Sequence, residues 1–152
     1  MTQAIPSLRA RLGACRGVLV DSNILLDVAT NDPAWGDWSK RALAEAAEHT
    51  ALIINPIIYA EVSIGYTTIE ALDAVLPATL YQREPLPWEA AFLAGKSFLL
   101  YRRRGGSRSS PLPDFYIGAH AAIERLALLT RDAARYRGYF PKVEILAPPM
   151  KT

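Results

Sequence analysis

The sequence has almost no cysteine, little histidine and no long apolar run, and each shortage excludes a class of protein. Its 152 residues include a single cysteine, Cys15, and two histidines. One cysteine excludes an internal disulfide framework and a cysteine metal cage. No apolar stretch approaches the roughly 20 residues of a membrane-spanning helix. The basic N-terminus, with Arg9, Arg11 and Arg16, is not followed by the apolar core of a signal peptide. We therefore expect a cytoplasmic protein with no membrane partner.

The chain also lacks a strong charge of either sign. Its formal net charge is +2, from 17 basic and 15 acidic residues, which is far from the signature of a pure nucleic-acid binder. The 51% hydrophobic content argues against disorder. This length predicts one domain over residues 1–152, with an N-terminal extension at 1–16 and a C-terminal tail at 148–152.

Short apolar runs alternate with helical periodicities along the chain. This alternation predicts an α/β fold with a central parallel sheet of about five strands flanked by helices. The predicted strands are 17–21, 51–55, 80–84, 126–130 and 143–146, and the main predicted helices are 35–49, 57–64, 67–76, 87–102 and one that begins at 114.

Four acidic residues stand where a strand ends or a helix begins. Asp21 directly follows the first strand, and Asp132 lies just after the fourth. Asp114 opens a helix, while Glu61 is the one charge of an apolar helix that we expect to be buried. Strand ends and helix starts share one edge of a parallel sheet, so the four carboxylates are expected to converge there. The alternative is that they are helix caps and surface charges, and Asp21 in particular suits the N-cap of the next helix.

Converging carboxylates favour a bound cation. Like charges that are packed together repel one another, and Mg²⁺ or Mn²⁺, which prefer carboxylate and water oxygens, remove that conflict. Such an ion lowers the pKa of a bound water and holds a phosphoryl oxygen, which suits phosphodiester hydrolysis. The spacing alone is a weak signal, because most of the 15 acidic residues lie elsewhere in the chain.

The sequences around the four acids add a resemblance to a known family. Val-Asp-Ser-Asn at 20–23, Ala-Glu-Val at 60–62, Pro-Asp-Phe-Tyr-Ile-Gly-Ala at 113–119 and Leu-Thr-Arg-Asp at 129–132 are similar to the acidic motifs of the PIN domain. The resemblance covers about residues 17–147 and is closest to bacterial VapC-type toxins. It implies a PIN-like three-layer fold and a Mg²⁺- or Mn²⁺-dependent endoribonuclease. It also implies a homodimer inhibited by a VapB-type antitoxin.

The same resemblance implies roles for individual residues. Asp21, Glu61, Asp114 and Asp132 would be the catalytic acids. Asp21 and Asp114 would touch the metal most directly, while Glu61 and Asp132 would act through water or orient it. Three polar residues beside the acids are expected either to support the site by hydrogen bonds or to serve only as caps and strand-end partners: Ser22, Asn23 and Thr130.

A cluster of arginines lies in a Gly/Ser-rich segment just before Asp114. Arginine suits bidentate contacts with phosphate, and glycines let the backbone approach a nucleic-acid strand, so we interpret this segment as RNA-binding. The alternative is a solvated helix C-terminus, where cations are favourable. The residues are Arg102, Arg103, Arg104 and Arg108.

Aromatic residues leave further choices open. Trp88, Phe92 and Leu99 share one stripe of the helix at 87–102, and we interpret Trp88 as a core or dimer residue. Tyr136 stands among basic residues, where it would either stack on bases or pack against the last strand. His120 is expected in the core or at an interface rather than as a catalytic base.

Two other functions compete with the nuclease hypothesis. A non-catalytic PIN-like module would bind RNA without cleaving it, although the presence of all four acids disfavours this. A phosphatase-like hydrolase would also use an acid at the end of a strand. Such enzymes have an Asp-x-Asp motif at this position, whereas the present chain has Asn23 in place of the second aspartate.

Overall fold

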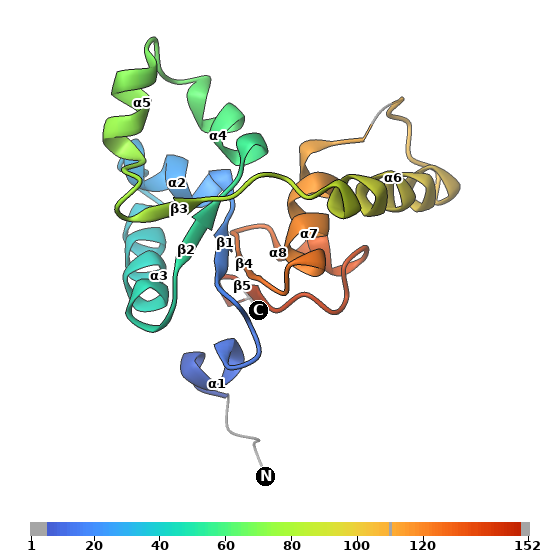
Figure 1. The fold of residues 1–152 in the computed structure, drawn as a ribbon, viewed down its shortest axis with the longest axis horizontal. Coiled ribbons are helices and arrows are strands. Elements are labelled where there is room, and N and C mark those ends of the chain that lie inside the picture. The colour runs from blue at the N-terminus through green and yellow to red at the C-terminus, as the bar shows by residue number, and fades with distance from the viewer. Residues whose placement is uncertain (1–5, 110, 150–152) are drawn as a thin grey trace.

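A computed structural model describes residues 6–109 and 111–149 of the chain. Its centre is a five-stranded, all-parallel sheet in the order β3-β2-β1-β4-β5 (Figure 1). The strands match the predicted runs but are shorter at their ends. They are β1 (Val18–Val20), β2 (Leu52–Ile54), β3 (Tyr81–Arg83), β4 (Ala127–Leu129) and β5 (Ile145–Leu146).

Helices cover both faces of this sheet, which confirms the predicted three-layer α/β fold. In Figure 1, α2 to α5 lie on one side of the strands and α6 to α8 on the other. This follows from right-handed crossovers that run outward from β1 to β3 and then return through β4 to β5. The helices are α1 (Leu8–Leu12), α2 (Ser22–Ala29), α3 (Gly36–His49), α4 (Pro56–Ser63), α5 (Ile69–Val75), α6 (Trp88–Arg103), α7 (Pro113–Ile123) and α8 (Ala133–Arg137).

Parts of three predicted segments fall outside the described residues. These are residues 1–5 of the N-terminal extension, residue 110 of the Arg-rich segment and residues 150–152 of the tail. The described part of the extension forms α1. Of the helices in the described ranges, none has the length and apolar character needed to cross a bilayer.

The inner strands explain why the apolar runs are continuous rather than alternating. Every residue of β1, β2 and β4 is buried, because helices cover both sides of the sheet. β1 lies between β2 and β4, so the direction of the chain across the sheet reverses at β1. Ligands of open α/β sheets bind beyond the carboxyl ends of the strands at such a reversal. The backbone N–H of Asp21 donates to the carbonyl of Leu129 (2.9 Å), which holds the ends of β1 and β4 together at this point.

Two predictions for the α4–α5 region are wrong in detail. α4 is apolar almost all round, but only Ile58 and Val62 are fully buried within it, and Ile64 at its end is 86% exposed. The helix packs on the body of the molecule along one side only. The N-cap of α5 is Thr68, whose hydroxyl accepts from the N–H of Ala71 (3.1 Å). The N-cap therefore lies one residue after the predicted one, and the predicted capping box does not form, because alanine at the third helical position has no side chain that could accept from the N-cap.

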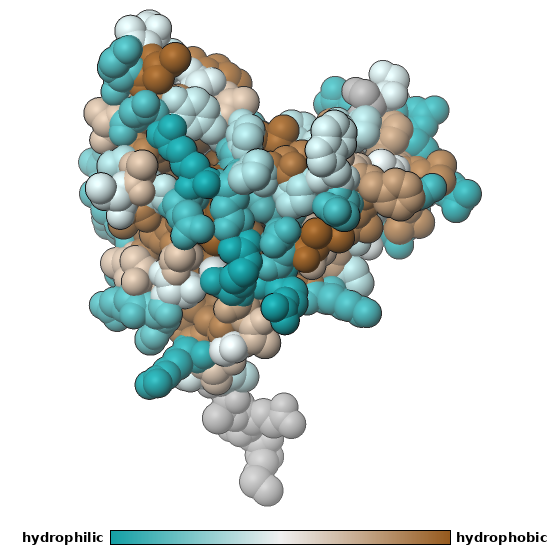
Figure 2. All heavy atoms as spheres, in the orientation of Figure 1, coloured by the Kyte–Doolittle hydropathy of each residue, from teal (hydrophilic) through white to brown (hydrophobic). Residues whose placement is uncertain are grey.

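The aromatic stripe of α6 faces outward. Trp88 is 89% exposed and Phe92 is 69% exposed, while the buried side of the helix is formed by Ala90, Ala94 and Ser97. These small side chains allow α6 to lie close against α7. Figure 2 shows hydrophobic surface gathered over α6 on the right of the molecule. Trp88 is therefore not a residue of the protomer core.

Candidate functional site

The four predicted acids lie on or next to four different helices, around the carboxyl ends of the strands. Asp21 caps α2, Asp114 lies in the first turn of α7, Glu61 lies on α4, and Asp132 immediately precedes α8. A cavity of about 500 Å³ is bordered by Glu61, Asp114 and Arg135. Figure 2 shows the surface hollowed between the side of the molecule that contains α4 and α5 and the side that contains α6.

Asp21 is buried and is held by three hydrogen-bond donors. Its Oδ1 accepts from the N–H of Ser22 (2.8 Å), which makes it the N-cap of α2. Its Oδ2 accepts from the hydroxyls of Thr130 and Tyr136, each at 2.8 Å. Burial raises the pKa of the Asp21 carboxyl, and the hydrogen bonds from Tyr136 and Thr130 oppose that shift. Asp21 therefore both caps α2 and belongs to the acidic site, so the two roles expected from the sequence do not exclude each other.

Tyr136 joins Asp21 to Asp114. Its hydroxyl lies 3.2 Å from Oδ1 of Asp114 as well as 2.8 Å from Asp21, and its ring is fully buried. Burial, together with the charges of Asp21 and Asp114, raises the pKa of the phenol far above its ordinary value, so the hydroxyl keeps its proton. Of the two alternatives for Tyr136, this burial agrees with packing in the core and excludes stacking on an RNA base.

Glu61 reaches the same region from α4. The hydroxyl of Ser22 donates to its Oε1 (3.1 Å). The side chain is half-buried rather than enclosed as the sequence predicted. Desolvation raises the pKa of Glu61, and the charges of Asp21 and Asp114 raise it further. Three carboxylates thus influence one another although they lie on separate elements.

Asp132 is more exposed than Asp21 and Asp114, and amide and hydroxyl contacts link it to the other acids. The Nδ2 of Asn23 lies 3.4 Å from Oδ2 of Asp132 and 3.3 Å from the hydroxyl oxygen of Thr130. The same hydroxyl oxygen accepts from the backbone N–H of Asp132 (3.1 Å) while its proton goes to Asp21. Ser22, Asn23 and Thr130 each contact at least one of the acids.

Sequence reasoning missed two members of this group, Tyr136 and Arg135. The guanidinium of Arg135 lies 3.6 Å from Asp114 and 3.7 Å from Asp132. On a helix, residues three and four positions after Asp132 return to its side, but α8 has only five residues and shows no periodicity from which the sequence could predict that helix. Arg135 is mostly exposed, so these ion pairs add little stability.

A fifth acidic residue near the site has its charge neutralised. Buried Asp27 accepts from the hydroxyl of Ser39 (2.9 Å) and from Nε of Arg131 (2.6 Å). Arg131 also stacks its guanidinium over the ring of Trp35 at 5.4 Å. We therefore assign Asp27 to the packing of α2 against α3 and not to the acidic site.

The donor set could hold Mg²⁺ or Mn²⁺, but not inside a complete protein cage. In residues 6–109 and 111–149, no three His, Cys, Asp or Glu side chains are grouped closely enough to coordinate one ion together. Mg²⁺ is usually bound by one or two carboxylates, with water and substrate oxygens completing the coordination. Asp21 and Asp114, brought together by Tyr136, fit that arrangement.

The predicted arginine cluster is exposed at the end of α6. Tyr101, on the last turns of the same helix, borders the cavity that contains Asp114. Arg104 donates to the carbonyl of Gly138 (3.2 Å) and covers the ring of Tyr139 at 5.1 Å. Arg102 donates to the carbonyl of Arg108 (2.7 Å). The cluster thus lies beside the acidic cavity, with part of its donor capacity used on the protein backbone.

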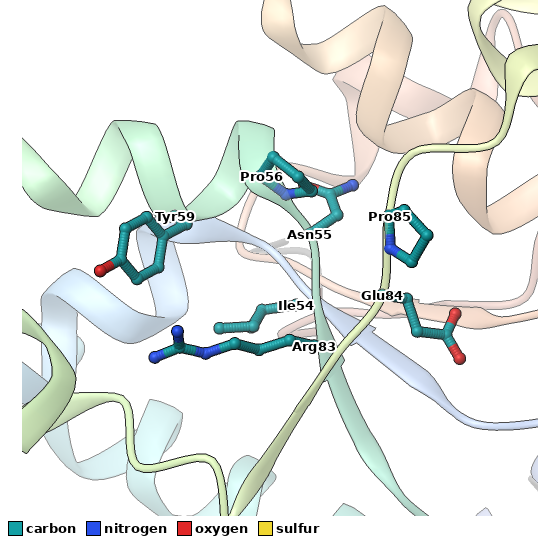
Figure 3. A pocket seen from close by; sticks show the side chains of 7 residues that line it. All are labelled: Ile54, Asn55, Pro56, Tyr59, Arg83, Glu84 and Pro85. Carbon is teal, nitrogen blue, oxygen red and sulfur yellow. The ribbon is translucent and has the colours of Figure 1, made fainter.

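A second cavity, of about 300 Å³, lies between the start of α4 and the end of β3 (Figure 3). Figure 3 shows Arg83 directed toward Tyr59, while Glu84, the next residue, points the other way. Glu84 pairs with Arg16 through both of its oxygens (2.7 and 2.8 Å). None of the four predicted acids borders this cavity, which is lined by Ile54, Asn55, Pro56, Tyr59, Arg83, Glu84 and Pro85.

Comparisons with known proteins identify the family and the fold. The PIN domain family model matches residues 18–141, which include all four acids. No curated protein matches the sequence significantly. The fold is similar to VapBC2 from Rickettsia felis bound to a promoter DNA fragment, with TM-score 0.67 and 18% identity over 86% of this chain and 97% of that chain. VapBC-1 from nontypeable Haemophilus influenzae gives 0.65 and 18% over 86% and 96%. A toxin–antitoxin complex from Klebsiella pneumoniae gives 0.60 and 23% over 89% and 100%.

Proposed function

Because this chain belongs to the PIN domain family, we propose that it is a metal-dependent endoribonuclease and the toxin of a toxin–antitoxin pair. The observation that carries the proposal is the convergence of Asp21 and Asp114 on the hydroxyl of Tyr136. Glu61 lies close enough for the charges of these two acids to add to the rise in its pKa that burial causes. Its setting is the cytoplasm, where the RNA substrate is found.

Each acid has a distinct part in the proposed reaction. Asp21 and Asp114 hold Mg²⁺ or Mn²⁺, which when bound lowers the pKa of a water and neutralises charge on a phosphoryl oxygen. Glu61, whose pKa is raised by burial and which is held in place by Ser22, accepts the proton of the attacking water. Asp132 orients water at the outer rim, and Asn23 and Thr130 hold it in place.

The arginine cluster supplies the proposed contacts with the RNA backbone. Arg102, Arg103, Arg104 and Arg108 are exposed next to the cavity, where guanidinium groups can bind successive phosphates. Such contacts are independent of base identity, so they determine affinity rather than the cleavage sequence. Replacing Arg102 and Arg103 with alanine should weaken RNA binding and reduce its salt dependence, as measured by filter binding at several salt concentrations.

Cleavage of total cellular RNA by the purified protein tests the catalytic proposal. We expect cutting at few sites with Mg²⁺ or Mn²⁺ and none with EDTA. Loss of a residue that only hydrogen-bonds to a metal ligand usually lowers activity by about 10- to 100-fold. Asp21→Asn and Asp114→Asn, which change the proposed ligands themselves, should each lower the cleavage rate by more than that. Asp37→Asn, the same change on the exposed start of α3, serves as the matched control.

Three outcomes would contradict the proposal. Cutting that persists in both acid variants would indicate a contaminating nuclease. RNA binding without cutting would favour the non-catalytic module. Metal-dependent release of phosphate from a small phosphomonoester, with RNA left intact, would favour the phosphatase-like hydrolase.

We also propose a VapB-type antitoxin as the protein partner. The support is that the three similar structures named above are of toxin–antitoxin systems, although their low identity relates them to this chain by fold alone. Expression of the wild-type protein in a bacterial host should arrest growth, and expression of Asp21→Asn should not. Co-expression of the proposed VapB-type antitoxin should restore growth. Equal growth of the two strains without that protein would contradict the toxin assignment.

We propose that the exposed stripe of α6 packs against a second copy of the chain. Trp88, Phe92, Gly95 and Leu99 are spaced four, three and four residues apart, and a Cβ at Gly95 would meet nothing within 4 Å. Such a seam suits close helix pairing. The helix starts with an acid, Glu89, and ends with basic residues, so two antiparallel copies would bring unlike charges together.

Light scattering after size-exclusion chromatography tests the proposed homodimer. The wild-type protein should run as a dimer, and Phe92→Lys should run as a monomer because it places a charge in the apolar seam. Val75→Lys, on another partly exposed apolar position in α5, is the matched control and should remain dimeric. A monomeric wild type, or a dimer that tolerates Phe92→Lys, would contradict the proposal.

A further inference from the structure

The hydroxyl of Tyr136 is a polar atom placed inside the acidic site by an otherwise apolar, fully buried side chain. The ring packs with the core, and only the hydroxyl oxygen meets the carboxylates, 2.8 Å from Oδ2 of Asp21 and 3.2 Å from Oδ1 of Asp114. Phenylalanine would fill the same apolar volume. The hydroxyl is therefore not needed for packing, and its effect falls on the two acids.

The two oxygens of Asp21 differ because of this contact. Each carboxylate oxygen has about two acceptor sites. Oδ2 already accepts from Thr130 and from Tyr136, both at 2.8 Å. Among the residues that the structure describes, Oδ1 accepts only the N–H of Ser22. Oδ1 is consequently the oxygen with acceptor capacity left for a further partner, and Asp21 can offer one oxygen but not both.

This difference discriminates between divalent cations. Ca²⁺ takes six to eight oxygens and often both oxygens of one carboxylate, whereas the smaller Mg²⁺ needs few carboxylate oxygens and keeps several waters. We propose that Tyr136 is a positioning residue which, with Thr130, fills Oδ2 of Asp21 and thereby selects Mg²⁺ over Ca²⁺. The inference rests on the proposed function, because it requires that Asp21 and Asp114 hold a metal ion.

Calorimetric titration of the full-length protein with Mg²⁺ and with Ca²⁺ tests this selectivity without measuring activity. In wild type, the dissociation constant for Ca²⁺ should exceed that for Mg²⁺. Tyr136→Phe should lower the ratio of the Ca²⁺ dissociation constant to the Mg²⁺ dissociation constant about tenfold, which corresponds to the loss of one hydrogen bond to a charged carboxylate. Thr130→Val removes the other donor to Oδ2 and should shift the ratio in the same direction. Tyr81→Phe makes the same chemical change at a buried tyrosine of β3 and should leave the ratio unchanged.

The outcomes separate this inference from the proposed function. If wild type binds both cations and neither Tyr136→Phe nor Thr130→Val changes the ratio, the inference is wrong while the metal site stands. The metal site and the inference both fail if wild type binds neither cation. They also fail if the double variant Asp21→Asn/Asp114→Asn binds Mg²⁺ and Ca²⁺ with the same affinity as wild type. A lower ratio in both variants, with an unchanged ratio in Tyr81→Phe, supports both.

Discussion

His120 is a buried titratable residue that the acidic site does not use. It lies on α7 with no exposed surface, and its Nδ1 is 2.9 Å from the Nδ2 of Asn55. Because the amide nitrogen can only donate, Nδ1 accepts and the ring proton lies on Nε2. Nε2 has no hydrogen-bond partner among the described residues, although Glu84 lies 3.7 Å away. Arg16 and Glu124 are the other charged groups that act on the ring.

This environment predicts an acid-sensitive contribution to stability. Burial lowers the pKa of His120 below its ordinary 6.5, and Glu84 only partly offsets the effect. The unfolded chain therefore binds the proton more readily than the folded one, so stability falls as the pH drops below about 6.5. Between pH 7.5 and 5.5, wild type should lose about 1 kcal/mol more unfolding free energy than His120→Asn.

Urea denaturation at the two pH values measures this difference. Asparagine keeps an acceptor near Nδ1 for Asn55 but has no titrating group. Asp21 and Glu61, whose raised pKa values act in the opposite direction, are present in both proteins and cancel in the comparison. A greater loss in His120→Asn than in wild type would mean that pairing with Glu84 outweighs the desolvation of the ring.

At the scale of elements, the acids were predictable and their phenolic partner was not. Buried parallel strands are continuous apolar runs in the sequence, so the sequence alone places Asp21 and the end of β4 at one sheet edge. α8 is only five residues long, which is too short to show helical periodicity. Without that helix, Tyr136 could not be assigned to the side that faces Asp21.

The orientation of α6 was unpredictable for a different reason. Its large apolar residues form the most hydrophobic stripe, which normally indicates the buried side. Here Ala90, Ala94 and Ser97 face α7, because a close approach of two helices depends on small side chains rather than on large ones. A sequence pattern gives the spacing of a stripe but not whether it packs within the protomer or against another chain.

Gly118 of α7 is a second case in which close packing requires a small residue. A Cβ built there would lie 2.3 Å from two ring carbons of Phe140. Alanine in place of a helical glycine usually stabilises a helix by about 0.5–1 kcal/mol, but overpacking a core costs about 1–3 kcal/mol. We expect the overpacking to dominate, so Gly118→Ala should lower the unfolding free energy measured in urea.

A double-mutant cycle identifies the contact responsible. Phe140→Leu removes the ring that the new methyl group would meet, so Gly118→Ala should cost less in that background than in wild type. Phe140→Leu alone leaves a cavity and is the reference for the cycle. An equal cost of Gly118→Ala in both backgrounds would show that the clash is relieved by movement elsewhere.

At the scale of the whole molecule, the topology concentrates negative charge at the point where the chain reverses across the sheet. Four separate elements bring acids to that edge. Burial is the main cause of the raised pKa values of Asp21 and Glu61, and the charge of Asp114 adds to both. This repulsion destabilises the folded protein while no cation is bound. Function and stability therefore make opposite demands on the same residues.

This conflict predicts that Asp114→Asn is more stable than wild type without a cation and less stable than wild type with Mg²⁺. In EDTA, Asp114→Asn should unfold at a higher temperature than wild type, because it removes a charge that opposes ionisation of two neighbours. With Mg²⁺ at about 100 times its dissociation constant, the unfolding free energy of wild type should rise by about 2.7 kcal/mol, while that of the variant should rise much less. Thermal unfolding followed by circular dichroism in the two buffers measures both effects, with Asp37→Asn expected to follow wild type. If Asp114→Asn melts below wild type in EDTA, its carboxylate stabilises the metal-free fold, through Arg135 or Tyr136, by more than its repulsion costs.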